Sequence, residues 1–234
     1  MRVAIVENTA ITHHGQVGVA LHEAAARVAI YRPFADGRLP DMAAYDALVV
    51  FGGEQAATDD HIHPYLPELA RCMNQAALSG QAVLGICLGA QVFARGAGAE
   101  NRLGAAPEFG WCGVGLTDAG RADPVLGGLE RRFPIFQWHS DTFTLPPSAA
   151  HLAANDSTPA QAFRIGRAGY GMQFHFEASR AVVDDWNRSF PAAILNLAPG
   201  WIDGYAQARA AHGAAADAAG LAIARAWVAR ISAD

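Results

Sequence analysis

The sequence contains no lysine: all 17 basic residues among its 234 positions are arginine. This absence excludes catalysis through a lysine Schiff base and ATP hydrolysis through a Walker-type loop, because both need a lysine amine. Charge is also scarce, at 17% of residues with a formal net charge of −5, and the basic residues form no stripe. Nucleic-acid binding therefore has no electrostatic support in the sequence.

Long apolar runs and cysteines are scarce as well. No run approaches the roughly 18 apolar residues that a membrane span needs, and residues 1–7 turn polar too early for a signal peptide. We therefore expect a cytoplasmic protein without a membrane partner. Cysteine is limited to Cys72, Cys87 and Cys112, an odd number without paired or metal-type spacing. This argues against a disulfide framework, and Cys72 and Cys112 are expected to pack in the core.

Apolar residues, in contrast, make up 52% of the chain, enough for a sizeable core. Short apolar runs alternate with helical patterns, which predicts an α/β fold with a mostly parallel sheet and helices on both faces. The expected strands are residues 3–6, 28–31, 47–51, 83–86, 151–154, 162–165 and 171–176. The expected helices are residues 15–26, 65–79, 88–95, 180–189 and 208–231. Residues 99–141, richer in glycine and proline, predict short strands and loops. Without a repeat or a linker, residues 1–234 are expected to form one domain.

The most informative motif surrounds Cys87. An apolar run leads into it, a helical pattern leads out, and Gly85 and Gly89 lie two residues to either side. This is the layout of a nucleophile elbow with cysteine in place of serine, in which a sharp turn needs small neighbours. The turn presents the sulfur at a helix N-terminus, where backbone N–H groups favour a thiolate and can stabilise an oxyanion.

A cysteine nucleophile needs a base, and the base needs a group that orients it. The alternating segment 171–177 offers both, because His175 and Glu177 lie two positions apart and would share one face of a strand. Ligands of open α/β sheets bind outside the carboxyl ends of the strands. We therefore expect Gly53, Cys87 and His175 to converge there.

Together these motifs resemble the class I (triad) glutamine amidotransferases. The family pattern of a glycine-flanked cysteine, a nearby glutamine and a late Gln-Phe-His-x-Glu is matched by Gly85, Cys87, Gly89, Gln91, Gln173, Phe174, His175 and Glu177. Three further matches are Gly52-Gly53 at a strand end, Glu108-Phe109-Gly110-Trp111, and Trp138-His139-Ser140-Asp141. The resemblance covers roughly residues 3–189.

The resemblance implies a flavodoxin-like sheet and hydrolysis of the side-chain amide of glutamine or a γ-glutamyl compound through a glutamyl thioester. Cys87 would attack the carbonyl, His175 would take and return the proton, and Glu177 would hold the histidine. Contacts to the oxyanion or the substrate are implied for Gly53, Leu88, Gln91, His139 and Ser140. Neither a cofactor nor a metal is implied, and the ammonia would pass to a partner, a separate synthase.

Two departures bear on the substrate. Glu54 follows the Gly-Gly, and Phe176 separates the histidine from the glutamate, where many members have proline. We expect the isolated protein to hydrolyse free glutamine slowly and to need a γ-glutamyl peptide or a synthase partner for its full rate.

Three alternatives stay open. The chain could be a stand-alone γ-glutamyl peptidase or hydrolase, or a non-catalytic binding or regulatory module on the same fold. A metal site at His13-His14 or at His61 and His63 is a third, although no acidic or cysteine cluster shares their spacing.

Overall fold

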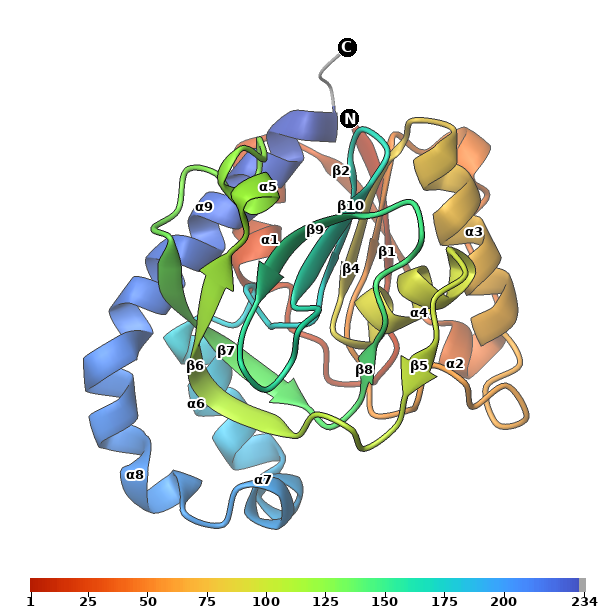
Figure 1. The fold of residues 1–234 in the computed structure, drawn as a ribbon. Helices are drawn as coiled ribbons and strands as arrows, with labels where there is room; N and C mark the ends of the chain where they lie inside the picture. Colours follow the sequence, from red (N-terminus) through yellow and green to blue (C-terminus); the bar gives the residue numbers. More distant parts are fainter. Residues whose placement is uncertain (232–234) are drawn as a thin grey trace.

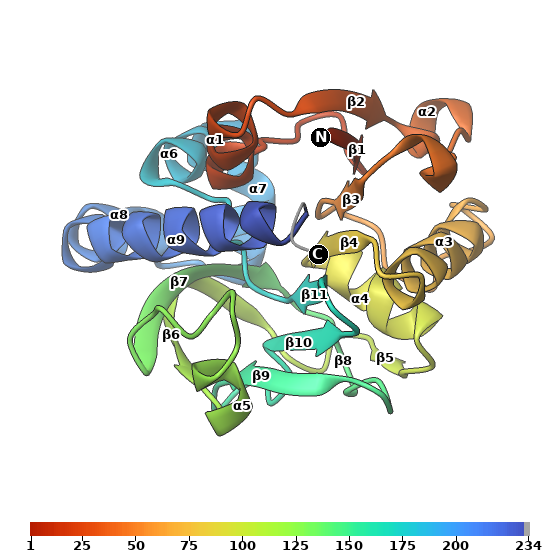
Figure 2. The same ribbon diagram turned by 90° about the horizontal axis from the view of Figure 1, so that it is seen from above.

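The computed structural model describes residues 1–231, and a nine-stranded sheet forms its centre (Figures 1 and 2). Five neighbouring strands are parallel, in the order β2 (Arg27–Tyr31), β1 (Arg2–Val6), β3 (Ala47–Val50), β4 (Ala82–Ile86) and β11 (Gly169–Met172). Beyond β11 the sheet continues in antiparallel fashion through β10 (Ala162–Ile165), β9 (Ala150–Ala154), β6 (Glu108–Leu116) and β7 (Arg132–His139). A separate pair consists of β5 (Asn101–Arg102) and β8 (Thr142–Phe143).

Helices cover both faces of the parallel strands, as predicted. Because side chains alternate along a strand, Val3 and Ile5 of β1 belong to one buried cluster, and Ala4 and Val6 belong to another. The covering helices are α1 (Gly15–Glu23) and α9 (Ala214–Ile231) on the first face, and α3 (Leu66–Leu78) and α4 (Leu88–Gly96) on the second (Figure 2). The α/β prediction is therefore confirmed.

The prediction of short strands and loops for residues 99–141 is wrong in part. β6 and β7 are the longest strands described, with nine and eight residues. Pro134 is tolerated because β7 lies at the edge of the sheet. Gly110 adopts a φ of +91°, and a β-carbon there would lie 2.6 Å from the Trp201 ring. The proline is thus accommodated in an edge strand, and the glycine allows a close packing contact with Trp201.

The prediction of a strand over residues 171–176 also needs correction, because β11 ends at Met172. After it the chain leaves the ladder with β4, and the backbone N–H of Gln173 donates to the carbonyl of Gln161. The N–H of His175 donates to the carbonyl of Phe136. His175 therefore forms an isolated bridge to β7, and Glu177 lies in the turn that follows, rather than both lying on one face of β11.

The C-terminal part contains more helices than the pattern predicted. The helix α6 (Arg180–Ser189) matches its expected bounds, whereas α7 (Pro191–Leu197) and α8 (Trp201–Ala208) were not expected. A π-helical turn (Arg209–Gly213) joins α8 to α9. The remaining helical elements are α2 (Pro33–Asp36), a 3-10 turn (Met42–Ala44) and α5 (Asp118–Arg121).

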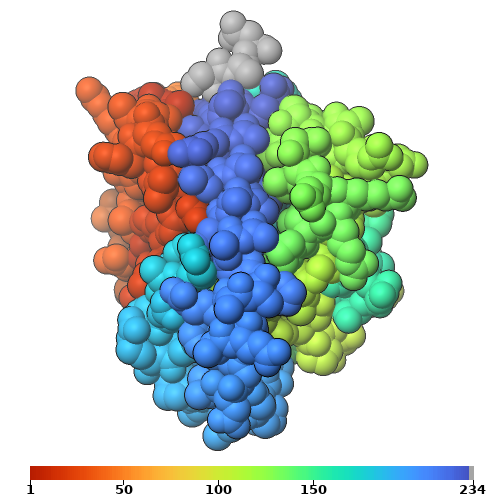
Figure 3. Space-filling view, turned by 90° about the vertical axis from the view of Figure 1, so that its left-hand side faces the viewer, coloured from red at the N-terminus to blue at the C-terminus, as the bar shows by residue number. Residues whose placement is uncertain are grey.

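The C-terminal helices complete the cover of the sheet. Figure 3 shows this part of the chain as a band between the N-terminal segment and the β6–β7 region. Trp111, Trp186 and Trp201 belong to an aromatic cluster that fixes α6 and α8 against β6 and β7. Within residues 1–231, no helix combines the length and apolar character needed to cross a bilayer.

Candidate active site

The residues singled out by the two main motifs meet at the carboxyl end of the parallel strands. Gly53 follows β3, Cys87 follows β4, and His175 follows β11; these three strands are neighbours in the sheet. All three residues line one cleft, together with Glu177. The expected convergence is thus produced by strand order, since parallel neighbours end at the same edge.

Cys87 occupies a strained turn between β4 and α4. Its φ of 52° and ψ of −109° lie outside the regions that non-glycine residues favour. A β-carbon on Gly85 would lie 2.5 Å from the carbonyl oxygen of Gly89, and one on Gly89 would overlap the carbonyl of Val50. The two glycines therefore let the start of α4 lie directly on β3 and β4, which is what the sharp turn requires.

The strained turn places the thiol at the first turn of α4. Cys87 is the N-cap residue of this helix, and its Sγ is directed at the carbonyl of Trp138, 3.6 Å away. The N–H of Leu88 belongs to the first helical residue and has no partner in the helix. Gly53 packs against Leu88, because a β-carbon on Gly53 would lie 2.9 Å from Leu88 Cδ2. The Gly53 turn and the start of α4 therefore lie side by side.

His175 and Glu177 form a tight pair beside the thiol. Nδ1 of His175 lies 2.6 Å from Oε1 of Glu177, and both side chains are buried. Because Nδ1 is engaged, Nε2 is the ring nitrogen left for chemistry. A β-carbon on Gly52 would lie 3.1 Å from Cε1 of His175 and 3.5 Å from Cβ of Cys87. Gly52 thus gives the imidazole room beside the cysteine.

The charge state of His175 follows from this pairing. Burial disfavours its cation, but the Glu177 carboxylate and the Cys87 side chain outweigh burial, so the pKa of His175 is raised well above its usual value. A histidine with a raised pKa is suited to take up a proton from a neighbouring group.

The other two cysteines have a different environment. Burial, and then the charge of Glu108, raises the pKa of the Cys112 thiol to about 11. Burial, and then the charge of Glu68, raises the pKa of the Cys72 thiol. Neither lines the cleft. Since thiolates are the reactive form, both are poor nucleophiles, and Cys87 is the cysteine suited to attack.

The cleft has a volume of about 470 Å³ and a wall that is more apolar than polar. Besides the residues named above, the following line it: Thr9, Ile11, Thr12, His13, Phe51, Glu54, Trp138, Ser140, Trp186, Phe190, Ala193, Asn196 and Leu197. Three of these residues were not predicted from the sequence: Trp186 of α6, Leu197 of α7, and Phe190 between the two helices. The amphipathic pattern of α6 was visible, but nothing in it showed that one edge of its apolar face borders the cleft.

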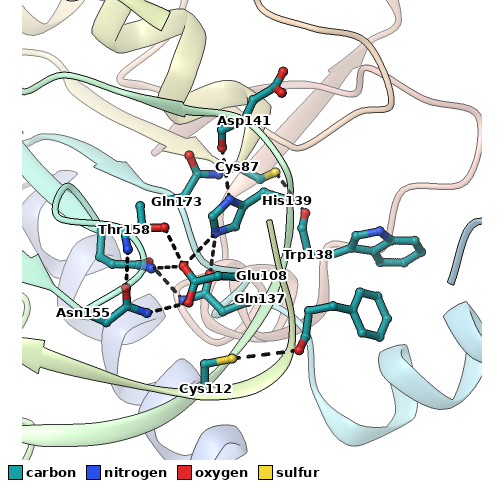
Figure 4. Close-up of polar contacts among 12 residues, drawn as sticks. Cys87, Glu108, Cys112, Gln137, Trp138, His139, Asp141, Asn155, Thr158 and Gln173 are labelled. Carbon is teal, nitrogen blue, oxygen red and sulfur yellow. Dashed lines mark hydrogen bonds and ion pairs between the residues drawn. The ribbon is translucent and has the colours of Figure 1, made fainter. Parts of the chain in front are cut away.

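A buried polar network lies on the other side of Trp138 (Figure 4). Its centre is the carboxylate of Glu108, which accepts hydrogen bonds from Asn155 (2.6 Å), Thr158 (2.6 Å) and Gln161 (2.8 Å). Burial opposes ionisation of Glu108, but hydrogen bonds from His139, Thr158 and Asn155 outweigh it and lower the pKa of the carboxyl. Glu108 is therefore ionised in the fold and fully satisfied.

His139 belongs to this network and does not line the cleft. Its Nδ1 lies 3.0 Å from the carbonyl of Asp141, which can only accept a hydrogen bond. Its Nε2 lies 3.1 Å from Oε1 of Gln137 and 3.4 Å from Oε2 of Glu108. His139 therefore bridges the Asp141 backbone and the side chains of Gln137 and Glu108. The network fixes the end of β7, and hence Trp138 and Ser140, which do line the cleft.

Gln91 is also buried away from the cleft. Its Nε2 donates to Oε1 of Gln173 (3.2 Å) and to the carbonyl of Asp141 (3.3 Å). These bonds tie α4 to the segment before His175 and to the end of β7. The predicted contact of Gln91 with substrate stays a prediction.

Of the two histidine pairs considered as metal ligands, His13 and His14 each have a carboxylate partner. His13 lies 2.8 Å from Asp185, and His14 lies 2.8 Å from Glu7. Within residues 1–231, no group of three or more histidine, cysteine or acidic side chains is arranged to hold a metal ion.

Comparison with known proteins agrees with this geometry. A family model described as glutamine amidotransferase class-I matches residues 15–185. The glutamine amidotransferase-like protein YfeJ of Salmonella typhimurium is 33% identical over 157 residues, 65% of this chain and 66% of that protein. A glutamine-hydrolysing GMP synthase subunit of Sulfolobus acidocaldarius is 30% identical over 61% of this chain and 72% of that one.

Two further likenesses concern substrate and fold. A γ-glutamyl-L-1-hydroxyisopropylamide hydrolase of Pseudomonas is 29% identical over 59% of this chain and 49% of that protein. A glutamine amidotransferase structure from Thermotoga maritima has a TM-score of 0.83, with 22% identity and 99% and 98% of the two chains covered. At that identity the structural match shows the fold alone, and it agrees with the predicted flavodoxin-like arrangement.

Proposed function

The chain belongs to the class I glutamine amidotransferase family, and on that premise we propose that it hydrolyses the side-chain amide of glutamine or of a γ-glutamyl compound through a thioester on Cys87. The observation that carries the proposal is the buried His175–Glu177 pair beside the strained cysteine. The proposal treats residues 1–234 as one domain that holds the whole site.

In the first half of the reaction, Sγ of Cys87 bonds to the γ-carbonyl carbon, and Nε2 of His175 takes up the thiol proton. The carbonyl oxygen becomes an oxyanion and accepts hydrogen bonds from the N–H groups of Gly53 and Leu88. The carbon–nitrogen bond then breaks, and His175 returns the proton to the departing nitrogen. Glu177 supports the histidine cation throughout, consistent with the raised pKa of His175.

In the second half, water replaces the amine beside His175. The histidine takes a proton from the water as its oxygen bonds to the thioester carbon. The carbon–sulfur bond breaks, the γ-carboxylate of glutamate leaves, and the proton returns to Cys87. No group other than this chain's own residues and water is needed for these steps.

The test is product release from glutamine and from γ-glutamylmethylamide. Wild-type protein should release ammonia or methylamine together with glutamate, and Cys87→Ala should release neither. Cys112→Ala is the matched control and should retain wild-type rates, because its thiol lies outside the cleft. Retained turnover in Cys87→Ala would refute the proposal.

Transfer of ammonia to a separate synthase is a second candidate function. It is favoured by the similarity to a subunit of a GMP synthase. The similarity to a γ-glutamylamide hydrolase favours a stand-alone role instead. Slow turnover of free glutamine by the isolated chain, with faster turnover of γ-glutamyl amides, would support the stand-alone role.

A further inference from the structure

Part of the wall of the cleft is aromatic. Trp138 comes from the end of β7, Trp186 from α6, and Phe190 from the junction of α6 and α7. The Trp138 ring centroid lies 5.2 Å from that of Trp186 and 5.6 Å from that of Phe190, with the rings edge to face. Figure 4 shows the Trp138 indole directed away from the buried Glu108 network. The three rings therefore form one continuous apolar surface.

This surface lies beside the histidine that must protonate the departing nitrogen. Glu177 occupies Nδ1 of His175, so the proton comes from Nε2, which has to reach the nitrogen within hydrogen-bond distance. The His175 ring lies edge to face with Trp186, at a centroid distance of 5.2 Å. In the proposed reaction the carbonyl oxygen accepts from Gly53 and Leu88, and the departing nitrogen receives its proton from His175, so these two substituents point in different directions. The group carried by the nitrogen is therefore the part of the substrate that meets the aromatic wall.

The charges of the cleft restrict what that group can be. Its acidic lining residues are Glu54 and Glu177, and within residues 1–231 no arginine lines it. Its basic groups are His175, which is paired with Glu177, and His13, which is paired with Asp185. The γ-glutamyl half already brings one carboxylate. A second carboxylate on the leaving amine would meet the like charge of Glu54 and find no unpaired cation among the lining residues.

We infer that the preferred substrate is a γ-glutamyl amide of an uncharged alkyl or aromatic amine, whose substituent packs on Trp186, Phe190 and Leu197. The inference rests on the proposed function and names its leaving group. Ammonia would leave the wall unused, whereas each methylene buried on it should raise kcat/KM about fourfold. A volume of about 470 Å³ lies within the range of small-molecule sites.

A series of substrates that differ only in the amine tests the inference. The compounds are glutamine and the γ-glutamyl amides of methylamine, propylamine and pentylamine, with γ-glutamylnorleucine, which adds a carboxylate to the pentylamine chain. We expect kcat/KM to rise about fourfold per methylene until the wall is covered. The pentylamide should exceed γ-glutamylnorleucine at least tenfold. A flat or falling series, or equal rates for those two compounds, would overturn the inference.

Two leucines on α7 test whether the dependence of kcat/KM on chain length arises at this wall. Leu197 lines the cleft, whereas Leu195 is 60% exposed and does not. Leu197→Ala should lower the ratio of pentylamide to methylamide kcat/KM at least threefold, and Leu195→Ala should leave it at the wild-type value. Equal ratios in the two variants would contradict the assigned wall.

The same series distinguishes failure of the proposed substrate preference from failure of the proposed function. Hydrolysis of glutamine and the methylamide without dependence on chain length overturns this inference alone. Absence of turnover above the Cys87→Ala background for every compound overturns the proposed function and this inference with it.

Discussion

Replacing Glu108 with glutamine should destabilise the protein by about 3 kcal/mol, because the amide cannot accept all the hydrogen bonds that the carboxylate accepts. In Glu108→Gln one oxygen becomes an NH₂ group. If this NH₂ group faces Asn155, the charge-assisted hydrogen bond from Asn155, of about 1.5–3 kcal/mol, is lost. The NH₂ groups of the new glutamine and of Asn155 then face each other, and both are donors. The bonds from Thr158 and Gln161 persist, but to a neutral acceptor they are about half as strong.

Asn155 cannot relieve this conflict by turning its amide over. Its Oδ1 accepts a 2.7 Å hydrogen bond from the N–H of Thr158, which would then be lost. For a chain of this size, about 3 kcal/mol corresponds to a fall in Tm of about 6–12 °C. Circular dichroism during heating, at pH 7, measures it.

The pH dependence provides an independent check. Because the pKa of Glu108 is lowered in the fold, its contribution is present above the ordinary carboxyl pKa of 4.5 and is lost as pH falls through the lowered value. The difference in Tm between wild type and Glu108→Gln should therefore shrink as pH falls below about 4.5.

The control is Glu100→Gln, whose carboxylate is exposed and forms a 3.6 Å ion pair with Arg102. That change should alter stability by less than about 0.5 kcal/mol. A Glu108→Gln protein that melts within one or two degrees of wild type, or no more changed than Glu100→Gln, would refute the reasoning about the network.

Three further outcomes are expected. His175→Asn should lower kcat by about 10²–10⁴-fold, the usual contribution of a positioned base, and a wild-type rate in stopped assays would exclude it as that base. Glu177→Gln should lower kcat by a smaller factor than His175→Asn. It should also move the alkaline limb of the kcat/KM profile to lower pH, because the Glu177 carboxylate raises the pKa of His175. An alkaline limb that stays in place or moves to higher pH would contradict the pairing. Gly89→Ala should destabilise the fold by about 2–3 kcal/mol in urea unfolding, because its β-carbon meets the Val50 carbonyl, whereas Gly128→Ala meets no atom within 4 Å and should be neutral. Equal stability of the two alanine variants would show that the elbow tolerates a side chain.

The parallel half of the fold could be predicted because its signals are local. The strands β1, β3 and β4 are short apolar runs that are buried on both faces, and the helices α3 and α4 have amphipathic patterns of their own. The cysteine turn was visible for the same reason, since Gly85 and Gly89 lie within two residues of Cys87. A steric requirement between residues that are close in the sequence can be recognised from a short segment.

The antiparallel half and the cleft wall depend on distant partners. The glycine and proline content of residues 99–141 predicted short strands and loops, but Gly110 makes room for Trp201, and Pro134 lies in an edge strand. The buried carboxylate of Glu108 is stabilised by hydrogen bonds from Asn155 and Thr158, which lie on a loop about fifty residues away in the sequence. No periodicity within one element records such contacts, and so the network could not be predicted.

The end of β11 shows a third limit. The alternation from Gly171 to Glu177 predicted a strand with His175 and Glu177 on one face. The strand ends at Met172, His175 forms an isolated bridge to Phe136, and Glu177 is buried in the turn that follows. They still pair, because Nδ1 of the histidine reaches the carboxylate across the turn. The pairing of His175 with Glu177 was therefore predicted, whereas the backbone conformation that brings them together was not.

Covalent labelling of Cys87 by an electrophilic glutamine analogue tests the central claim most directly. Peptide mapping by mass spectrometry should find one adduct, on the peptide that contains Cys87, appearing in step with loss of hydrolytic activity. The Cys87→Ala protein should carry no adduct and show no turnover. An adduct on Cys72 or Cys112, or hydrolysis that continues in the Cys87→Ala protein, would contradict the account.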